Sequence, residues 1–178
     1  MAEWFIQFCL ILARHAGLTF LAGQLLYLWL KLIHIAAVIA FLGNITTGLF
    51  WHAHAARTRD PRLLAHTVDG IIRSDRLFTI PGVVIIVAGG LAAAIVGGYP
   101  ILHTSWIVSS LILFTVSGLV FIIRVAPLQV QLRALAQAGV ERGSFDWARY
   151  QRLARTWERW GAVALLTPVG ALVLMVLK

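Results

Sequence analysis

Apolar residues run almost without interruption through four stretches of this chain, at about residues 30–50, 77–96, 106–123 and 161–177. Each stretch holds close to the roughly 20 helical residues needed to cross about 30 Å of hydrocarbon. The stretches lack the polar–apolar alternation of a membrane-spanning β-barrel, so the spanning elements are expected to be helices. The pattern predicts an all-α membrane protein built as a four-helix transmembrane bundle.

The composition requires a lipid environment for most of this apolar surface. The chain has 178 residues, of which 60% are hydrophobic and only 12% are charged. A soluble domain of this length does not bury so much apolar surface in one core, so the expected surroundings are a lipid bilayer. A single cysteine, Cys9, excludes an intramolecular disulfide and a cysteine-based metal site.

The positive charges are concentrated in two stretches between the spans. The net charge is +8, and 12 of the 15 lysines and arginines fall within residues 51–77 and 124–160. The link at residues 98–105 contains no Asp, Glu, Lys or Arg. Because cytoplasmic loops carry an excess of Lys and Arg, we expect both basic stretches to be cytoplasmic and the link and the C-terminus to lie on the opposite side. Nucleic acid is not an expected partner.

Residues 1–23 are expected to form an N-terminal interfacial helix, followed by the four-span membrane domain at residues 24–178. Arg14 and His15 interrupt two apolar runs. The positive charge follows the first run instead of preceding it, which argues against a signal peptide. A fifth span and a disordered arm remain alternatives for this segment.

A second amphipathic helix is predicted before the fourth span, with Ser144 as its N-cap and Arg159 near its end. At 100° per residue, aromatic and arginine side chains fall on opposite faces. The aromatic face holds Trp147, Tyr150, Leu153, Ala154, Trp157 and Trp160, and the basic face holds Arg149, Arg152, Arg155 and Arg159. This pattern is typical of a helix lying on anionic lipid headgroups, with packing on a partner subunit as the alternative. A shorter surface helix is expected at residues 128–138.

Lys31 and His34 lie three residues apart on one face at the start of the first span. Ionisable residues inside a membrane are candidates for function. A seam of small residues, which includes Ala40 and Gly43, runs beside His34 and allows close helix packing, so His34 is expected to face protein. Its imidazole could ligate a metal or haem, relay protons, or hydrogen-bond a neighbouring helix. The stem of Lys31 is long enough to carry its charge to the interface.

The histidines available as a second haem ligand on the same side are His103 and His15. His103 precedes Trp106 at the start of the third span, whereas His34 lies roughly 6 Å inside the first, a mismatch on the order of 10 Å. This depth difference argues against His103 as the second ligand and leaves open a haem held by His34 alone or by His34 and a non-histidine group. The candidate cofactor-binding residues are His34, Lys31 and His103.

The basic stretches contain a second set of polar candidates. His52, His54 and His66 are interpreted as surface histidines, because a metal site at the first two requires the helix to end before them. The residues Asp69, Arg73, Asp75 and Arg76 are spaced for surface ion pairs, which contribute little to stability. In the spans, Gly90 belongs to a small-residue packing surface, and Pro168 is expected to kink the fourth helix.

Four motifs in order resemble a bacterial family of predicted integral membrane proteins known by a domain-of-unknown-function label, number 2269. They are Leu-Lys-Leu-Ile-His-Ile-Ala-Ala from Leu30, Arg-Ser-Asp-Arg-Leu-Phe-Thr-Ile-Pro-Gly from Arg73, Gly-Tyr-Pro-Ile-Leu-His-Thr-Ser-Trp from Gly98, and Val-Ala-Pro-Leu-Gln-Val-Gln-Leu-Arg from Val125. The resemblance covers Tyr27 to about Gly139. It implies a bacterial inner membrane, and in that membrane the charge distribution predicts a periplasmic C-terminus.

The Lys31-x-x-His34 opening is also similar to the first helix of haem-b membrane protoporphyrinogen oxidases and of copper-resistance-type membrane domains. That resemblance implies haem binding at His34. The lysine that the oxidase family carries on its third helix has no counterpart, because residues 106–123 contain no lysine. Oxidation of protoporphyrinogen is therefore not expected.

These observations support three functional hypotheses. The leading one is a small b-type haem or redox membrane protein, with His34 as axial ligand and Lys31 near a haem propionate or a quinone headgroup. The second is a non-catalytic accessory subunit of a larger membrane complex. The third is a transporter-like protein that handles metal ions or protons through His34, Asn44 and the cytoplasmic histidines. Whether the protein is an enzyme stays open.

Overall fold

The computed structural model describes residues 2–177, with side chains from Thr19 onward, and every long element in this part of the chain is a helix. Three short elements lie between the long helices: the π-helical turns η1 (Asp75–Thr79) and η3 (Phe121–Val125) and the 3₁₀ turn η2 (Ile101–His103). The long helices are α1 (Ala2–Thr58), α2 (Pro61–Ser74), α3 (Ile80–Val96), α4 (Ser105–Val120), α5 (Ala126–Arg142) and α6 (Trp147–Leu177).

The described residues contain four helical rods that are long and apolar enough to cross a membrane. Two of the rods are α1 and α6, and the other two are composite, because η1 joins α2 to α3 and η3 joins α4 to α5 without a loop. The predicted all-α, four-helix membrane bundle is confirmed. The third predicted span, which ended at residue 123, continues as helix through Arg142.

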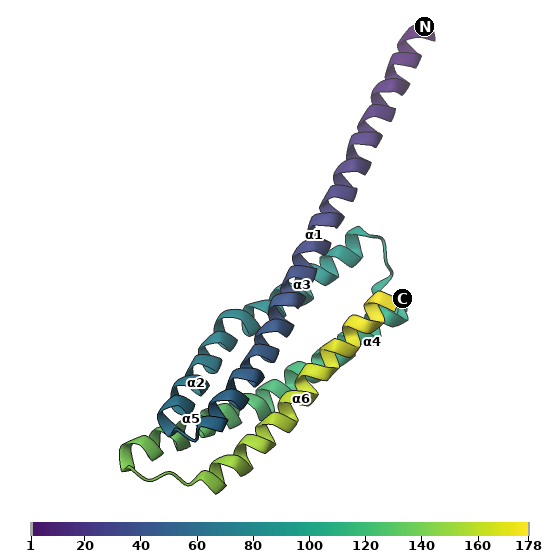
Figure 1. Cartoon of the computed structure of the whole chain (residues 1–178). Coiled ribbons are helices and arrows are strands. Elements are labelled where there is room, and N and C mark those ends of the chain that lie inside the picture. The colour runs from purple at the N-terminus through teal and green to yellow at the C-terminus, as the bar shows by residue number, and fades with distance from the viewer. Residues whose placement is uncertain (1, 178) are drawn as a thin grey trace.

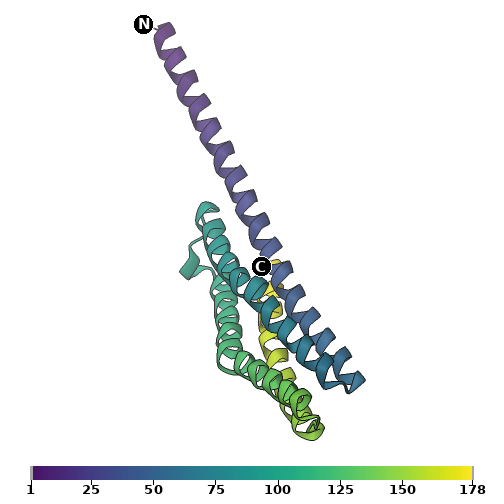
Figure 2. The ribbon, with the colours of Figure 1, turned by 90° about the vertical axis from the view of Figure 1, so that its left-hand side faces the viewer.

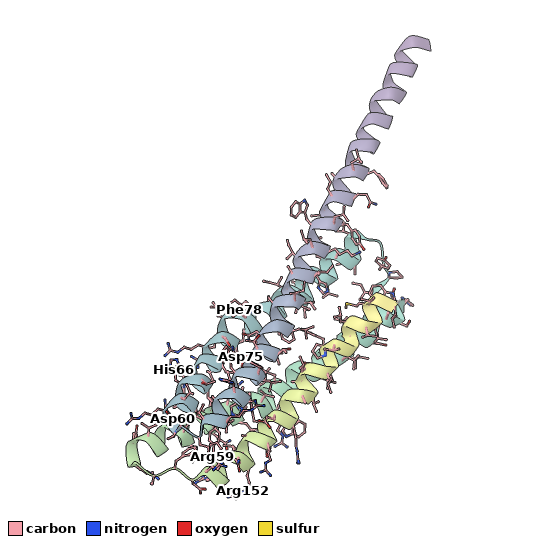
Figure 3. The ribbon with its side chains drawn as sticks, viewed as in Figure 1. Arg59, Asp60, His66, Asp75, Phe78 and Arg152 are labelled. Atoms are coloured by element: carbon pink, nitrogen blue, oxygen red, sulfur yellow. The ribbon has the colours of Figure 1, made fainter. Side chains whose placement is uncertain are left out.

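The rods pack as two pairs that join at one end. Helix α1 packs along α3, α4 packs along α6, and α2 packs on α5 (Figure 1). Figure 2 shows α1 extending past the rest of the bundle at its N-terminal end. The C-terminus lies near the start of α4, while Arg59 and Arg152 lie at the opposite end (Figure 3). The basic stretches therefore share one end of the molecule, as expected; which side of the membrane that end faces stays a prediction.

Both π-helical turns lie just before a proline. A proline inside a helix lacks an N–H and crowds the carbonyl four residues earlier. Pro81 and Pro127 have this effect on the preceding turns, where the N–H of Ile80 bonds to the carbonyl of Asp75 and that of Ala126 to the carbonyl of Phe121. Because each of these hydrogen bonds spans five residues instead of four, the helix is wider at η1 and η3. The side chains there are rotated relative to those of the helices on either side.

Pro168 lies inside α6, where it leaves the carbonyl of Ala164 without its usual helical donor. The hydroxyl of Ser117 on α4 donates to that carbonyl at 2.6 Å. Ser110, two turns earlier on α4, donates in the same way to the carbonyl of Ala171 at 3.2 Å. Each serine hydroxyl donates a hydrogen bond to a main-chain carbonyl of α6. The two bonds hold α4 against α6 at two positions along the helices.

The main core lies at the end where the two pairs join. The N-cap of helix α2 is Asp60, whose side-chain oxygen accepts a hydrogen bond from the N–H of Arg62 at 2.8 Å. The buried side chains of α2 recur at helical spacing, pack on α5, and belong to one core cluster with buried residues of α5 and α6. The core residues that are almost completely buried include Leu64, Val68, Leu132, Ala136 and Tyr150.

Two sequence predictions about amphipathic helices are changed by the structure. Helix α1 has no end near residue 23; its 57 residues form one rod of about 85 Å. No helix boundary separates residues 1–23 from the first span. That these residues lie at the membrane surface therefore stays a prediction. Helix α5 contains the whole of the predicted helix at residues 128–138 and is longer at both ends.

The predicted helix from Ser144 to Arg159 is instead the first half of α6, which continues into the fourth span. Asp146, not Ser144, provides the cap, because its side chain accepts the N–H of Arg149 at 2.9 Å. Trp157 is only 3% exposed and packs in the main core. The expectation that this aromatic face lies on lipid headgroups is wrong for Trp157 and Tyr150: they are buried in the core of the same chain, where both contact His52 of α1.

Candidate functional site

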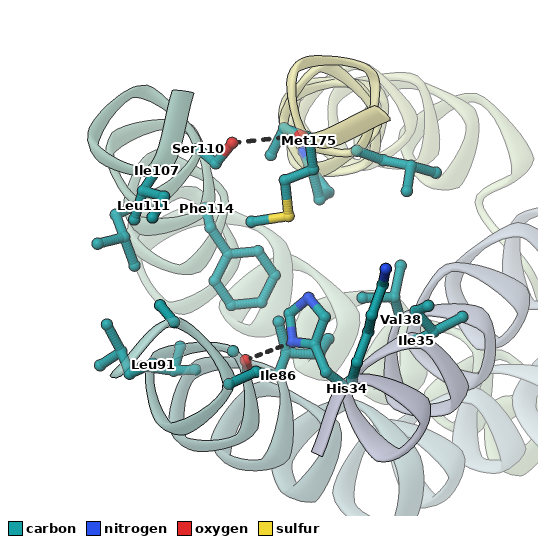
Figure 4. A pocket seen from close by; sticks show the side chains of 18 of the residues that line it. His34, Ile35, Val38, Ile86, Leu91, Ile107, Ser110, Leu111, Phe114 and Met175 are labelled. Carbon is teal, nitrogen blue, oxygen red and sulfur yellow. Dashed lines mark hydrogen bonds between the residues drawn. The ribbon is translucent and has the colours of Figure 1, made fainter. Parts of the chain in front are cut away.

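A cavity of about 560 Å³ separates the two helix pairs at the end away from the main core. Its walls come from α1, α3, α4 and α6, and they are mainly aliphatic and aromatic (Figure 4). Polar side chains on the wall include Lys31, His34 and Ser110, and the Ser110 hydroxyl is engaged with the α6 backbone. Ligand sites of roughly 300–1,000 Å³ with few polar groups are typical of small-molecule and cofactor binding.

The imidazole of His34 has a defined orientation in this cavity. Its Nδ1 lies 2.8 Å from the main-chain oxygen of Ile86 on α3. Because a carbonyl only accepts, Nδ1 carries the proton and donates, so the neutral ring keeps its lone pair on Nε2. Figure 4 shows that this second nitrogen points into the cavity.

One of two neighbouring glycines on α3 makes room for the ring. A Cβ at Gly90 would lie 2.9 Å from both Cε1 and Nδ1 of His34, a distance that real Cβ contacts do not show. A Cβ at Gly89 would lie 3.7 Å from the Cβ of His34, which is ordinary contact. Gly90 is therefore specifically required for the imidazole to reach the carbonyl of Ile86, a role more defined than the general packing surface expected from sequence.

Lys31 lies one turn before His34 and also lines the cavity. Its side chain is exposed, and its Nζ lies 5.8 Å from the centre of the Tyr27 ring. An ammonium at this distance from an aromatic face is weakly attracted to it. The structure therefore places one cation and one imidazole along the same wall of an otherwise apolar chamber.

Met175 of α6 points into the cavity from the side opposite His34 (Figure 4). Met175 is not a candidate from sequence, because one methionine in a uniformly apolar span carries no distinguishing signal. Phe114 of α4 also projects into the space and contacts Phe41 with ring centres 5.5 Å apart. The cavity thus offers a soft thioether facing a basic nitrogen.

The structure does not bring His103 to this site. His103 is exposed in the turn η2 and does not line the cavity. The other proposed partner, His15, lies outside the part of the chain whose side chains are described. Among the described side chains, His34 is the only histidine on the cavity wall, and no group of three or more His, Cys, Asp or Glu is arranged to hold a metal ion.

Asp75 forms a second polar cluster, buried in the turn η1 (Figure 3). The carboxylate is 7% exposed and accepts hydrogen bonds from Asn44, Thr79 and Gln129. The expectation of a surface ion pair is wrong for Asp75, since it is buried and bonded to neutral groups. It is correct for Asp69, which pairs with Arg73 at 2.7 Å.

His52 is the buried member of the second histidine set. It is 1% exposed, with Nε2 3.0 Å from the hydroxyl of Tyr150 and Nδ1 3.5 Å from a carboxylate oxygen of Glu158. The surface interpretation is therefore wrong for His52, which connects α1 to α6, and correct for His54 and His66, which are exposed.

The predicted basic face of α6 is accessible. All four of its arginines, Arg149, Arg152, Arg155 and Arg159, are exposed. The first two line a shallow hollow of about 470 Å³ between α5 and α6. Trp160 is half-buried, and the guanidinium of Arg124 lies 5.3 Å from its ring. Contact of this face with anionic lipid stays a prediction.

Comparison with known proteins identifies one family. A family model described as a predicted integral membrane protein (DUF2269) matches residues 28–178. No curated protein and no solved structure matches the chain. These comparisons lend no support to the more distant resemblance to haem-b oxidases and copper-resistance domains.

Proposed function

The chain belongs to the DUF2269 family of predicted integral membrane proteins, whose description assigns no activity, and from its cavity we propose that it is a small b-type haem protein of the membrane with His34 as an axial ligand. The observation that carries this proposal is the bond from Nδ1 of His34 to the carbonyl of Ile86. Metal-ligating histidines commonly donate one ring N–H to a carbonyl or a carboxylate while the other nitrogen binds the metal.

The other residues of the cavity fit the chemistry of this cofactor. Imidazole is the usual axial ligand of haem b, and apolar walls exclude water from the macrocycle. Lys31 lies on the cavity wall, and its ammonium would offer a positive charge to pair with a haem propionate. Bound haem would supply one-electron transfer, while the chain holds the iron, orients the ring and sets the polarity around it.

The proposal is tested by the visible spectrum of the purified protein. The chain is produced in cells supplied with a haem precursor, purified in detergent, and measured before and after reduction with dithionite. A b-type spectrum with sharp bands on reduction is expected. His34→Ala should abolish the spectrum, whereas the matched control His103→Ala should retain it, because His103 does not line the cavity.

Two results would contradict the haem assignment. One is a folded, colourless protein after expression with abundant haem precursor. The other is a pigment that survives His34→Ala unchanged. Lys31→Gln tests the contribution of the positive charge: it should leave the band positions unchanged and reduce the amount of haem retained through dialysis.

A further inference from the structure

The buried carboxylate of Asp75 is surrounded by donors from three elements. The side-chain amide of Asn44 on α1 donates to Oδ1 at 3.0 Å, and the hydroxyl of Thr79 in η1 donates to the same oxygen at 2.8 Å. The amide of Gln129 on α5 donates to Oδ2 at 2.8 Å. Asn44 also donates to Thr79 at 3.0 Å, so the four side chains form one connected network.

No described cation neutralises this carboxylate. The three salt bridges in the described part of the chain involve other acids. Arg73 and Arg133 both pair with Asp69, at 2.7 and 3.3 Å, and Arg76 is exposed. Three neutral donors therefore stabilise a charge that is almost completely removed from solvent.

The charged and titratable groups of the surrounding elements are directed elsewhere. On α1, His34 bonds to Ile86 and His52 to Tyr150, while His54 and Arg57 are exposed. Arg133 on α5 pairs with Asp69, and Arg124 in η3 and His66 on α2 are exposed. Helix α3 has no titratable side chain, and the acid of α2, Asp69, is paired on the surface. A change in the charge of Asp75 is thus not absorbed by a neighbouring ionisable group among the described side chains.

The position of the network adds a second argument. Asn44 belongs to the apolar stretch at residues 30–50, roughly 9 Å from its end along the helix. Asp75 lies in a π-helical turn, a local widening that is frequent at functional sites. A purely structural network could use an asparagine at this position, with the Gln129 amide turned to offer its oxygen, without the cost of burying an unpaired charge.

We propose that Asp75 is a proton-binding site, which takes up a proton from the aqueous phase on one side of the bundle and releases it reversibly. Binding forms an O–H bond on the carboxylate and removes its negative charge. This site is separate from the cavity beside His34 and does not depend on haem.

Infrared difference spectroscopy of the protein in lipid nanodiscs tests the proposal. Lowering the pH should produce the carbonyl band of a buried protonated carboxyl group, shifted in heavy water. Asp75→Asn should remove this band. The matched control Asp69→Asn should keep it, because Asp69 is a paired surface acid.

If Asp75→Asn does not fold, a second variant still tests whether Asp75 binds the proton. Thr79→Val removes one donor to the charged form, so the midpoint of the band should move to higher pH by about one pH unit. The proposal is overturned if no band depends on Asp75, or if Thr79→Val leaves the midpoint unchanged. A midpoint that moves with sodium concentration would overturn it in favour of a sodium site.

Discussion

The Nδ1 of His34 lies 2.8 Å from the carbonyl oxygen of Ile86, and the absence of a side chain at Gly90 makes this contact possible. In a helix, the side chain four residues after a carbonyl lies beside that carbonyl. For the carbonyl of Ile86 this residue is Gly90, which has no side chain and leaves the carbonyl accessible. The bond holds the first span against the second and leaves Nε2 directed into the cavity.

Gly90→Ala should displace the imidazole of His34. Its Cβ would meet the ring at 2.9 Å, so the ring must rotate away from Ile86 or the helices must separate, at a cost of about 1–3 kcal/mol. Thermal unfolding in detergent measures the loss. Gly89→Ala is the matched control, since its Cβ makes only ordinary contact at 3.7 Å. Equal stability of the two variants would show that Gly90 does not position His34.

Ser117→Ala should destabilise the pairing of α4 with α6. Loss of the hydroxyl leaves the carbonyl of Ala164 without its donor, which costs roughly 1–3 kcal/mol. In a Pro168→Ala background the same change should cost less, because an alanine at position 168 restores the helical N–H. A double-mutant cycle by thermal unfolding measures this coupling. Strict additivity would disprove the link between Ser117 and Pro168.

Tyr150→Phe should weaken the junction between α1 and α6. Glu158 lies nearest to Nδ1 of His52, which favours a proton on that nitrogen and leaves Nε2 to accept the Tyr150 hydroxyl. Removing the hydroxyl leaves a buried nitrogen unbonded, at about 1–3 kcal/mol. Unfolding in a graded denaturant series measures the effect. His54→Ala, at an exposed position of the same helix, should change stability by less than ~0.5 kcal/mol.

A paired Arg149→Gln and Arg152→Gln variant should bind anionic lipid less tightly. Both side chains are exposed beside the hollow between α5 and α6, and each basic residue near an anionic surface contributes ~1 kcal/mol. Native mass spectrometry with added phosphatidylglycerol measures the retained lipid. Arg62→Gln on α2 is the control for a general charge effect. If both variants lose lipid equally, the hollow has no special role.

The positions of the membrane-spanning helices can be predicted from sequence, because they depend on the hydrophobicity of each segment alone. Long apolar runs predict spans whatever their neighbours are, and the four runs correspond to the four rods observed. The prolines at positions 81, 127 and 168 are visible in the sequence, which predicts a kink at Pro168 but neither the π-helical turns nor the hydrogen bond from Ser117. Whether a proline widens a turn or leaves a carbonyl for Ser117 depends on which helix packs beside it.

The sequence alone established four membrane-spanning helices and the shared helix face of Lys31 and His34, since hydrophobicity and the 100° helical step are properties of the chain itself. Tertiary packing decided that the Ile86 carbonyl accepts a hydrogen bond from the His34 imidazole, that Asp75 is buried with no cation beside it among the described side chains, and that Trp157 points inward. In a lipid environment the outer and inner faces of a helix are both apolar, so periodicity does not reveal which face meets protein. Only the packed helices distinguish a lipid-facing residue from one in a site.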